Sequence, residues 1–391
     1  MARRVGLEVS LACSEAVKLA NVDVIAAYPI TPQTHIVEHL SELVADGDLD
    51  AEFVPVESEH TAMSACVGSS AAGARTFTST AAQGLALMHE ILFIAPALRL
   101  PIVMAVANRS LSGPISIWND HSDIMAERDV GWIQTFAENG QEVLDLTLHA
   151  FKVAEDPRVI LPVAVNMDGF TLTHVIEPIE MPDQAEVDAY LPPFVPQQRL
   201  DIANPISMGL VGVPEIYTEA RKAITVALED SYEVIKEHWD GFAKQFGRQY
   251  RPIETYKTED AETILVTMGS TGETCMTAVD EMREAGQKVG QIRIRLWRPF
   301  PCQDFLDAVK GAKCLAVMDR ALQPGSDSGP VGTELKALLY SRGLNLHVSN
   351  FVAGLSGRDV TRDNFKMMAE KAAQAQAAGS PMTCEMVGVK E

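Results

Sequence analysis

Cysteine is scarce in this sequence, and the cysteines that occur are not paired. No two of the six stand in a CxxC spacing. Ferredoxin-type iron–sulfur sites and structural zinc sites use such closely spaced cysteines, so neither kind of site is predicted. We expect buried free thiols at Cys13, Cys66, Cys275, Cys302, Cys314 and Cys384. If the protein takes part in electron transfer, its metal clusters lie on another chain.

Positive charge is also in deficit. The 391 residues include 32 Lys and Arg against 53 Asp and Glu, which gives a formal net charge of −21. A surface of this sign repels nucleic-acid backbones and anionic membrane surfaces. We therefore expect a solvated acidic surface and no nucleic-acid partner.

A long uninterrupted apolar run is missing as well. The most apolar stretch, residues 91–107, contains Pro96, Arg99 and Pro101, which break any membrane-spanning helix. The first ten residues, MARRVGLEVS, carry basic residues without the apolar segment of a secretory signal. The sequence predicts a cytoplasmic protein that does not enter a membrane.

Glycine motifs for phosphate binding are absent too. Neither GxGxxG nor GxxxxGK(S/T) occurs. The small-residue segment 68–84 is better explained by close helix packing. The turn SGPVGTEL at 328–335 enters a helix, where an anion can bind, but it is not specific for one.

What the chain does contain is a regular alternation of helix and strand. Its length exceeds that of a single core, so two domains are expected. Near-continuous runs of Val, Ile and Ala indicate parallel strands covered on both faces, with functional loops at their carboxyl ends. In the first domain we expect strands at 22–27, 51–56, 74–80, 101–107 and 159–167, and helices at 7–21, from about 34, from about 58, at 84–95 and at 141–155.

An arm and a second α/β domain follow. From about residue 176 the sequence is rich in proline and acids, before a helical span near 215–239. Beyond 262 we expect strands at 263–270, 288–297 and 314–320, helices at 272–285, 299–312 and 329–342, and a polar tail helix at 362–379 that is frayed or docked on a partner. The predicted division is a first domain of residues 1–255, arm included, and a second of residues 256–391.

Two glutamates stand where a helix is expected to begin after a strand. Glu57 and Glu59 lie in the segment VESEHTAM. Either suits the first turn of a helix, because a negative charge there interacts favourably with the helix dipole. The residues alone do not rank the two.

Arg109 follows the strand at 101–107, at the edge where α/β sheets bind their ligands. A guanidinium can hold a carboxylate through two parallel hydrogen bonds, which suits a small anionic substrate. A surface arginine that caps a loop explains the same position equally well.

Two other groups are weaker candidates. His121 and Asp123 lie in the irregular loop 110–123, but no third ligand accompanies them at metal-site spacing. A loop that closes over a site, or a subunit contact, is therefore favoured over a metal site. Arg298 precedes a proline at a strand end, and a rigid turn in a packed interface is favoured for it.

Longer segments carry a resemblance. They are YPITPQT at 28–34, SEHTAMSACVGSSAAGAR at 58–75, FTSTAAQGLALMHE at 77–90, VANRSLSGP at 106–114 and IWNDHSDIMAERDVGWIQTFAENGQEVLDL at 117–146. Together they resemble the α subunit of 2-oxoacid:ferredoxin oxidoreductases, most closely the pyruvate:ferredoxin oxidoreductase (pyruvate synthase) type, whose first domain is a thiamine-diphosphate-binding domain of the pyrimidine type. The segments TMGSTGET, IRLWRPFP and MDRALQPGSDSGPVGTE resemble the transketolase C-terminal-like domain of the same subunit.

This resemblance implies cofactors that are held mostly by other chains. In the family, a β subunit with a GDG-type motif holds thiamine diphosphate and Mg²⁺, and 4Fe–4S clusters on partner subunits pass electrons to ferredoxin. This chain lacks that motif, since residues 46–48 read DGD. Its length fits a four-subunit arrangement with β, γ and δ partners, in which coenzyme A enters as co-substrate.

The resemblance also implies roles for individual residues. Glu59 matches the glutamate that hydrogen-bonds the aminopyrimidine ring of thiamine diphosphate across the subunit interface, which favours the imino tautomer that removes a proton from the cofactor. Glu57 falls outside the matched position.

The substrate residues are implied in the same way. Arg109 matches the clamp for the substrate carboxylate, and Thr31 matches a hydroxyl beside it that hydrogen-bonds the 2-oxo acid. Tyr28 and Ile30 would shape a small pocket. Thr31 and Ser112 stand where a dicarboxylate would need extra positive charge, which favours pyruvate.

The expected protein is thus the α subunit of a pyruvate:ferredoxin oxidoreductase that is active only as a complex. It would convert pyruvate and coenzyme A to acetyl-CoA and carbon dioxide, reversibly, while ferredoxin is reduced. Alternatives are the same family acting on oxalate, 2-oxoglutarate or a branched-chain 2-oxo acid, a non-catalytic scaffold subunit, and a redox-independent thiamine decarboxylase half.

Overall fold

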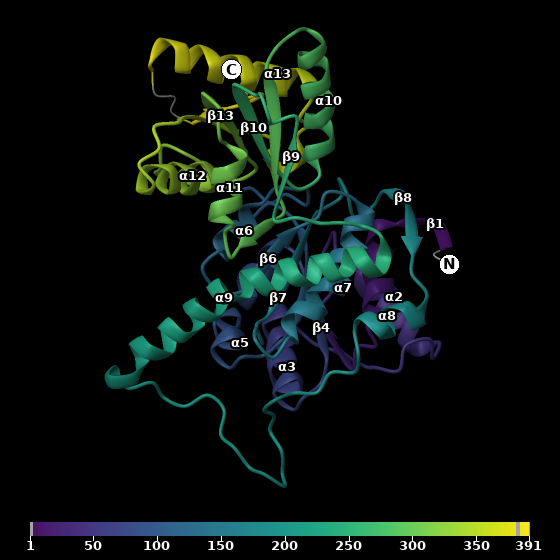
Figure 1. Cartoon of the computed structure of the whole chain (residues 1–391). Helices are drawn as coiled ribbons and strands as arrows, with labels where there is room; N and C mark the ends of the chain where they lie inside the picture. The colour runs from purple at the N-terminus through teal and green to yellow at the C-terminus, as the bar shows by residue number, and fades with distance from the viewer. Residues whose placement is uncertain (1–2, 381–383, 391) are drawn as a thin grey trace.

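A seven-stranded sheet organises the first part of the chain. The computed structural model describes residues 3–380 and 384–390 (Figure 1). The strand order is β12-β6-β7-β5-β4-β2-β3, and every neighbouring pair is parallel except β12 with β6. The strands are β2 (Val24–Ala27), β3 (Glu52–Pro55), β4 (Thr76–Thr80), β5 (Val103–Asn108), β6 (Ile133–Phe136), β7 (Val163–Asp168) and β12 (Leu296–Arg298).

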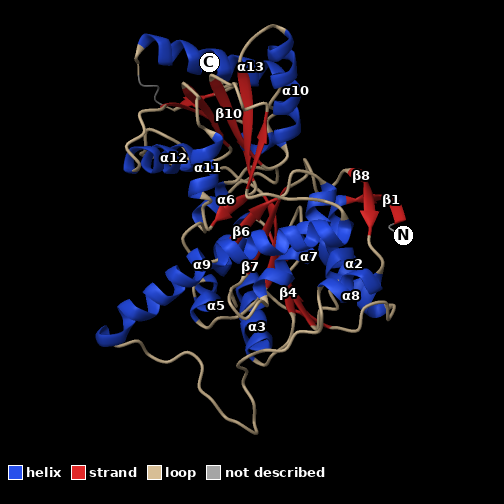
Figure 2. Ribbon diagram, viewed as in Figure 1, coloured by secondary structure: helices blue, strands red, loops and turns tan. Residues whose placement is uncertain are grey.

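Helices cover both faces of this sheet, as the apolar runs predict (Figure 2). On β5, Val103 and Ala105 belong to one apolar core, and Met104 and Val106 belong to the other. The first core is closed by α1 (Val9–Leu19), α2 (Thr34–Ala45), α7 (Gly140–Ala154) and α9 (Pro214–Phe246). The second is closed by α3 (Glu59–Ala71), α4 (Ala82–Leu92), α5 (Ile94–Ala97) and α6 (Ser122–Ala126). Burial on both faces explains why these strands carry no polar alternation.

Before and after this sheet the chain departs from the prediction. The helix expected from residue 7 begins at Val9, because β1 (Arg3–Glu8) pairs antiparallel with β8 (Ile176–Met181). After α8 (Gln184–Tyr190), residues 192–213 form the arm, which has no regular structure and projects from the body together with the start of α9 (Figure 1).

A second, six-stranded sheet has the order β15-β14-β13-β10-β11-β9. Its strands are β9 (Ile253–Tyr256), β10 (Thr263–Met268), β11 (Val289–Ile294), β13 (Cys314–Asp319), β14 (His347–Val352) and β15 (Glu385–Met386). The accompanying helices are α10 (Thr271–Glu284), α11 (Cys302–Ala308), α12 (Pro330–Ser341), the short η1 (Leu355–Gly357) and α13 (Arg362–Ala378). The α/β fold with two large, mostly parallel sheets is therefore confirmed.

The expectation that the tail helix is frayed is wrong, whereas docking on a partner stays a prediction. The helix α13 packs into its own domain, because Phe365, Met368 and Ala372 are buried in the core that it forms with α10 and the second sheet. Without these side chains one face of the sheet would be exposed, so α13 is part of the second domain.

The single strand expected at 288–297 is also wrong. Its first part is β11 in the second sheet, and after Arg295 the chain enters the first sheet as β12, which pairs with β6. Conversely, β9 begins at Ile253 and already pairs with β11. The division at residue 255 stays a prediction, since strands near it serve both sheets.

Candidate active site

The first sheet has a crevice at the carboxyl ends of β2 and β4. From β2 the chain crosses to β3 on one side, and it then returns to β4 on the other side of β2. Connections that leave two adjacent strands in opposite directions open a crevice where α/β proteins bind ligands. The segments 28–33 and 81–84 follow these two strands, so the sequence-predicted Tyr28, Ile30 and Thr31 stand at this point.

Gln33 joins the two sides of the crevice. Its side chain is fully buried, and Nε2 donates to the backbone carbonyls of Tyr28 (2.9 Å) and Ser79 (3.0 Å). The segment after β2 is thereby tied to the end of β4. Sequence reasoning missed Gln33, because a lone glutamine before a helix gives no signal of which carbonyls it will meet.

Thr31 and Arg109 are brought together, but through the backbone of Thr31. The Nη1 of Arg109 donates to the Thr31 carbonyl (2.9 Å), and its Nε donates to the Ser116 carbonyl (2.7 Å). Arg109 is 6 % exposed, and burial lowers the pKa of its guanidinium. Within residues 3–380 and 384–390, neither Arg109 Nη2 nor the exposed Thr31 hydroxyl makes a hydrogen bond.

Glu59 is the first residue of α3 and has no partner in the described part of the chain. Ser58 caps the helix by accepting a hydrogen bond from the Thr61 backbone N–H (3.2 Å), which fixes the direction in which α3 begins. Glu59 is only 7 % exposed, yet its carboxylate forms no hydrogen bond or ion pair with any described residue. Burying a charged group without a partner is costly, so the site is suited to a partner from outside the chain.

Glu57 differs from Glu59 in both respects. It is exposed, and it accepts a hydrogen bond from the Thr61 hydroxyl (2.9 Å). Hydrogen bonds from its own backbone N–H and from Thr61 lower the pKa of Glu57. The structure therefore distinguishes two glutamates that residue type and position alone left equal.

Tyr28 and Ile30 point to different places. Tyr28 is 37 % exposed and lines a cavity of about 470 Å³ with Pro29, Val37 and Phe53. Ile30 is half-buried and packs on the apolar core under α1 and α2. Both remain next to Thr31 in the chain, but they do not line one common pocket.

Asp123 holds together the segments at the carboxyl edge of the first sheet, and it does not form a metal site with His121. Its carboxylate accepts backbone N–H bonds from Ala82 (3.0 Å), Arg109 (2.9 Å) and Ile124 (2.8 Å), and one from Asn108 Nδ2 (3.1 Å). Burial raises the pKa of Asp123 to about 6, although these hydrogen bonds oppose the shift. The residue joins the segments after β4 and β5, and so it positions the backbone of Arg109.

His121 instead pairs with Asp168 at the end of β7, at 2.8 Å between Nε2 and Oδ1. The other carboxylate oxygen accepts from Arg320 Nη1 (2.6 Å) and the Ser270 N–H (3.0 Å) of the second domain. Burial disfavours the ionised form, but Arg320 and His121 hold the pKa of Asp168 well below its usual value. The loop 110–123 is thus part of the contact between the two domains.

Arg298 has the structural role that the sequence favours. Its guanidinium donates to both carboxylate oxygens of Glu334 (2.9 and 2.8 Å) and to the Arg128 carbonyl (3.1 Å). These bonds join β12, α12 and the loop before β6.

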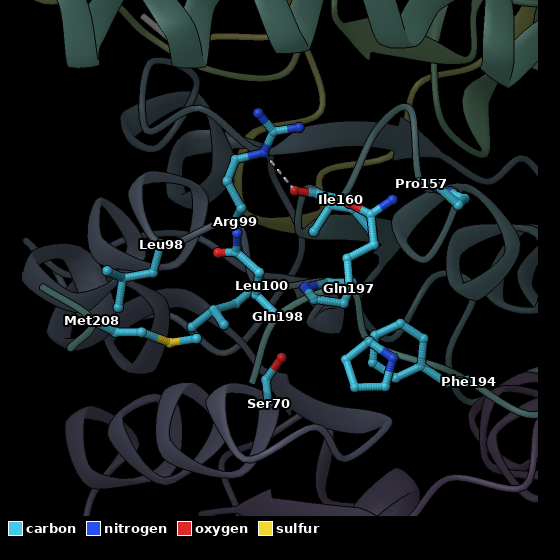
Figure 3. A pocket seen from close by; sticks show the side chains of 12 residues that line it. Ser70, Leu98, Arg99, Leu100, Pro157, Ile160, Phe194, Gln197, Gln198 and Met208 are labelled. Carbon is cyan, nitrogen blue, oxygen red and sulfur yellow. Dashed lines mark hydrogen bonds between the residues drawn. The ribbon is translucent and has the colours of Figure 1, made fainter. Parts of the chain in front are cut away.

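The opposite edge of the first sheet contains a second cavity, of about 240 Å³. The arm forms one wall through Phe194, Gln197 and Met208, and Ser70 points its hydroxyl into the space (Figure 3). None of the sequence-predicted site residues lines this cavity.

Residues 3–380 and 384–390 offer neither a metal-ligand cluster nor a membrane-spanning helix. No cluster of three or more His, Cys, Asp or Glu side chains suited to a metal ion occurs there. No helix in the same residues has the length and apolarity needed to cross a membrane.

The chain matches two protein families. Residues 15–240 match the family described as "Pyruvate flavodoxin/ferredoxin oxidoreductase, thiamine diP-bdg". Residues 261–365 match the family described as "Pyruvate:ferredoxin oxidoreductase core domain II". The two matches account for both α/β units.

Individual relatives agree with these matches. The chain is 50 % identical to pyruvate synthase subunit PorA of Methanocaldococcus jannaschii, over 93 % of this chain and 94 % of the relative. It is 45 % identical to ketoisovalerate oxidoreductase subunit VorA of Pyrococcus horikoshii, over 90 % and 89 %. The solved 2-oxoglutarate:ferredoxin oxidoreductase from Magnetococcus marinus shares its fold, with a TM-score of 0.69, 19 % identity, and coverage of 96 % of this chain and 65 % of that one.

Proposed function

The chain belongs to the pyruvate:ferredoxin oxidoreductase family, and on that premise we propose that it is the α subunit of an enzyme acting on pyruvate. The complete reaction converts pyruvate and coenzyme A to acetyl-CoA, carbon dioxide and a proton, and two electrons pass to ferredoxin. The identity of 50 % over nearly the whole of a pyruvate synthase subunit supports pyruvate as the substrate.

One observation carries the catalytic part of this proposal. Glu59 is an enclosed carboxylate without a partner among the described residues, beside a crevice at a topological switch point. Such a group fits the ring nitrogen of an aminopyrimidine presented by another chain, because the hydrogen bond supplies the partner that Glu59 lacks. The site therefore fits thiamine diphosphate at its pyrimidine end.

When bound, thiamine diphosphate supplies the carbon nucleophile for the 2-oxo group and the electron sink for loss of carbon dioxide. The task of Glu59 is to hold a hydrogen bond to the aminopyrimidine ring nitrogen. This bond shifts the protonation of the ring toward the tautomer that acts as a base. A fixed carboxylate in a mostly dry position performs this task better than the exposed Glu57.

Arg109 is the proposed clamp for the substrate carboxylate. Its Nη1 and Nε are engaged by backbone carbonyls, which hold the guanidinium in place and leave Nη2 without a hydrogen-bond partner among the described residues. Thr31, whose carbonyl receives one of these bonds, offers its hydroxyl to the 2-oxo group. A single such guanidinium suits a monocarboxylate.

The remaining cofactors and partners are proposed from the family. A β subunit would hold the diphosphate and Mg²⁺, and γ and δ subunits would carry 4Fe–4S clusters that deliver electrons to ferredoxin. Coenzyme A would enter as co-substrate. The lack of any CxxC spacing in this chain supports clusters on other subunits. A cytoplasmic location is part of the same proposal.

A branched-chain 2-oxo acid is the alternative substrate, and one relative supports it. The ketoisovalerate oxidoreductase subunit is 45 % identical to this chain, which favours such an acid. Tyr28, which lines the cavity beside Thr31, is the side chain whose size would separate it from pyruvate. Comparing kcat/KM for pyruvate and ketoisovalerate on the assembled complex decides between them.

The catalytic proposal is tested by two glutamine variants of the assembled complex. Glu59→Gln keeps the size of the side chain but removes the carboxylate, and we expect kcat with pyruvate to fall about 100-fold or more. Glu57→Gln is the matched control, and its kcat should stay within about twofold of the wild-type value because Glu57 is exposed. Normal turnover by Glu59→Gln would mean that the chain is a scaffold.

A further inference from the structure

Gly84, in the first turn of α4, lies where a side chain would collide with Glu59. A Cβ atom at this position would lie 2.7 Å from Glu59 Oε1, 2.8 Å from Glu59 Cγ and 2.5 Å from Thr80 Oγ1. Contacts below 3.0 Å are essentially never made by real Cβ atoms. Three elements therefore converge on this point: α3 through Glu59, β4 through Thr80 and α4 through Gly84.

The backbone does not explain the glycine. Gly84 is absent from the residues with positive φ, so an L-amino acid could adopt its conformation. Glycine is also a poorer helix former than alanine, and it sits within the helix Ala82–Leu92. The reason for a glycine here is the space that its neighbours occupy.

We propose that Gly84 is a positioning residue for Glu59: its missing side chain leaves the slot in which the carboxylate is held against the first turn of α4. The inference rests on the proposed function, because it assigns Gly84 a role through the glutamate that contacts the cofactor. The role is indirect, because Gly84 would act through the side chain of Glu59.

The two neighbours would respond differently to a methyl group at residue 84. Thr80 is fully buried at the end of a central strand, between β2 and β5, but its hydroxyl makes no hydrogen bond among the described residues, so a rotation about its Cα–Cβ bond can relieve that contact. Glu59 has a longer side chain, and its carboxylate is not held by any hydrogen bond among the described residues. The carboxylate must therefore move as well, and the fold can survive while the catalytic geometry does not. A misplacement of about 1 Å can cost on the order of 100-fold in rate.

The test compares two glycine variants in the assembled complex. Gly84→Ala should raise the Kd for thiamine diphosphate, measured by calorimetry, and lower kcat with pyruvate by at least about tenfold. Gly68→Ala is the matched control: Gly68 lies in α3 itself, and apart from its chain neighbours and the backbone of its own helix no described atom lies within 4 Å of its Cβ position. This control should keep the wild-type Kd and kcat. If Gly84→Ala also keeps both within about twofold, the inference is wrong.

Combining Gly84→Ala with a shorter side chain at residue 59 shows whether the loss of activity is caused by displacement of Glu59. Aspartate is one methylene shorter, so Glu59→Asp should make room for the methyl group, and adding Gly84→Ala to it should change kcat and Kd less than about twofold. The double variant also serves if Gly84→Ala alone does not assemble. If the double variant does not assemble either, or if Gly84→Ala costs as much in the Glu59→Asp background as in the wild type, Gly84 does not act through Glu59 and the inference fails.

The proposed function fails in a different way. It fails if Glu59→Gln has wild-type turnover, whatever Gly84 does. If Glu59→Gln loses turnover while Gly84→Ala behaves as Gly68→Ala, the proposed function stands and only the role of Gly84 is refuted.

Discussion

The two edges of the first sheet are built in contrasting ways. At the carboxyl edge, buried polar side chains bind the backbone of neighbouring segments: Gln33 joins two carbonyls, and Asp123 accepts from three backbone N–H groups. At the amino edge, the arm carries apolar side chains in solvent, with Ile202, Leu210 and Val211 largely exposed. The same strands thus end in a rigid polar frame on one side and a loosely attached apolar segment on the other.

This difference shows in which part of the sheet side-chain positions must be exact for catalysis. Catalysis needs groups held to a fraction of an ångström, and many hydrogen bonds from a rigid sheet provide that. The arm has few such anchors; one is the bond from the Leu200 N–H to the Ala71 carbonyl (2.8 Å). Perturbations at the carboxyl edge should therefore have large effects, and perturbations of the arm should have small effects on the fold.

The largest effect on stability is expected where the carboxyl edge meets the second domain. Glu142, in the first turn of α7, is buried and accepts from Arg293 (2.9 and 3.0 Å) and Arg295 (2.6 Å). Glu142→Gln leaves two buried guanidiniums without this carboxylate, and the free energy of unfolding should fall by about 3–5 kcal/mol in urea titrations. Glu237→Gln, which breaks an exposed pair with Arg158 (2.7 Å), should cost far less, because solvent screens an exposed ion pair. Equal losses would remove the contrast between buried and exposed pairs.

The next largest effect concerns the substrate clamp. Arg109→Ala should lower kcat/KM for pyruvate roughly 100-fold in the assembled complex, since a charge-assisted hydrogen bond to the carboxylate is lost. Arg109→Lys keeps the charge but cannot bind the Thr31 and Ser116 carbonyls in the same fork, so it should recover only part of the loss. Full activity of the lysine variant would show that charge alone suffices.

The ionisation of Asp123 gives a smaller effect with a definite sign. Its pKa is raised from 3.8 to about 6 by burial, so between these values the folded protein binds the proton that the unfolded chain has released. The stability contribution of this group is therefore complete below about pH 4 and is lost as the pH rises through about 6, a change of about 3 kcal/mol.

The measurement is the difference in unfolding free energy between the wild type and Asp123→Asn at about pH 4 and about pH 6.5. As the pH rises, the unfolding free energy of the wild type should fall relative to that of Asp123→Asn. The reason is that the Asp123 carboxyl ionises in this range, whereas asparagine does not titrate. A difference that is independent of pH would contradict the burial of a titrating carboxylate at this position.

The smallest effects on the free energy of unfolding are expected at two isoleucines, one of them fully buried and the other fully exposed. Ile25 in β2 is fully buried, and Ile25→Val should cost about 0.5–1.5 kcal/mol of unfolding free energy. Ile202 in the arm is fully exposed, and Ile202→Ser should change it by less than about 0.5 kcal/mol. A larger cost at Ile202 would mean that the arm is an integral part of the fold.

The parts of the fold that are predictable from the sequence share one property. The strands β2, β4 and β5 are buried on both faces, so each is visible as a continuous run of small or branched residues. The strands β6 and β12 have four and three residues, and their pairing joins segments about 160 residues apart in the chain, which no local pattern reveals.

The candidate site divides in the same way. The functional loops at the carboxyl ends of the strands follow from the alternation of helix and strand, and the nearness of Thr31 to Arg109 follows from the motif resemblance. The position of the crevice requires the strand order, which the structure supplies. The motif resemblance selects Glu59 over Glu57, but the physical difference between them is burial, which depends on α4 packing against α3. Gln33, Gly84 and Asp123 could not be predicted, because the partners of each come from separate segments after different strands.

The central claim is that Glu59 meets the aminopyrimidine ring of thiamine diphosphate from a neighbouring subunit. An experimental structure of the assembled complex with the cofactor bound tests it most directly. We expect a Glu59 carboxylate oxygen within about 2.6–3.2 Å of the aminopyrimidine ring nitrogen. A Glu59 carboxylate that instead pairs with a protein side chain of another subunit, with the ring nitrogen bound elsewhere, would contradict it.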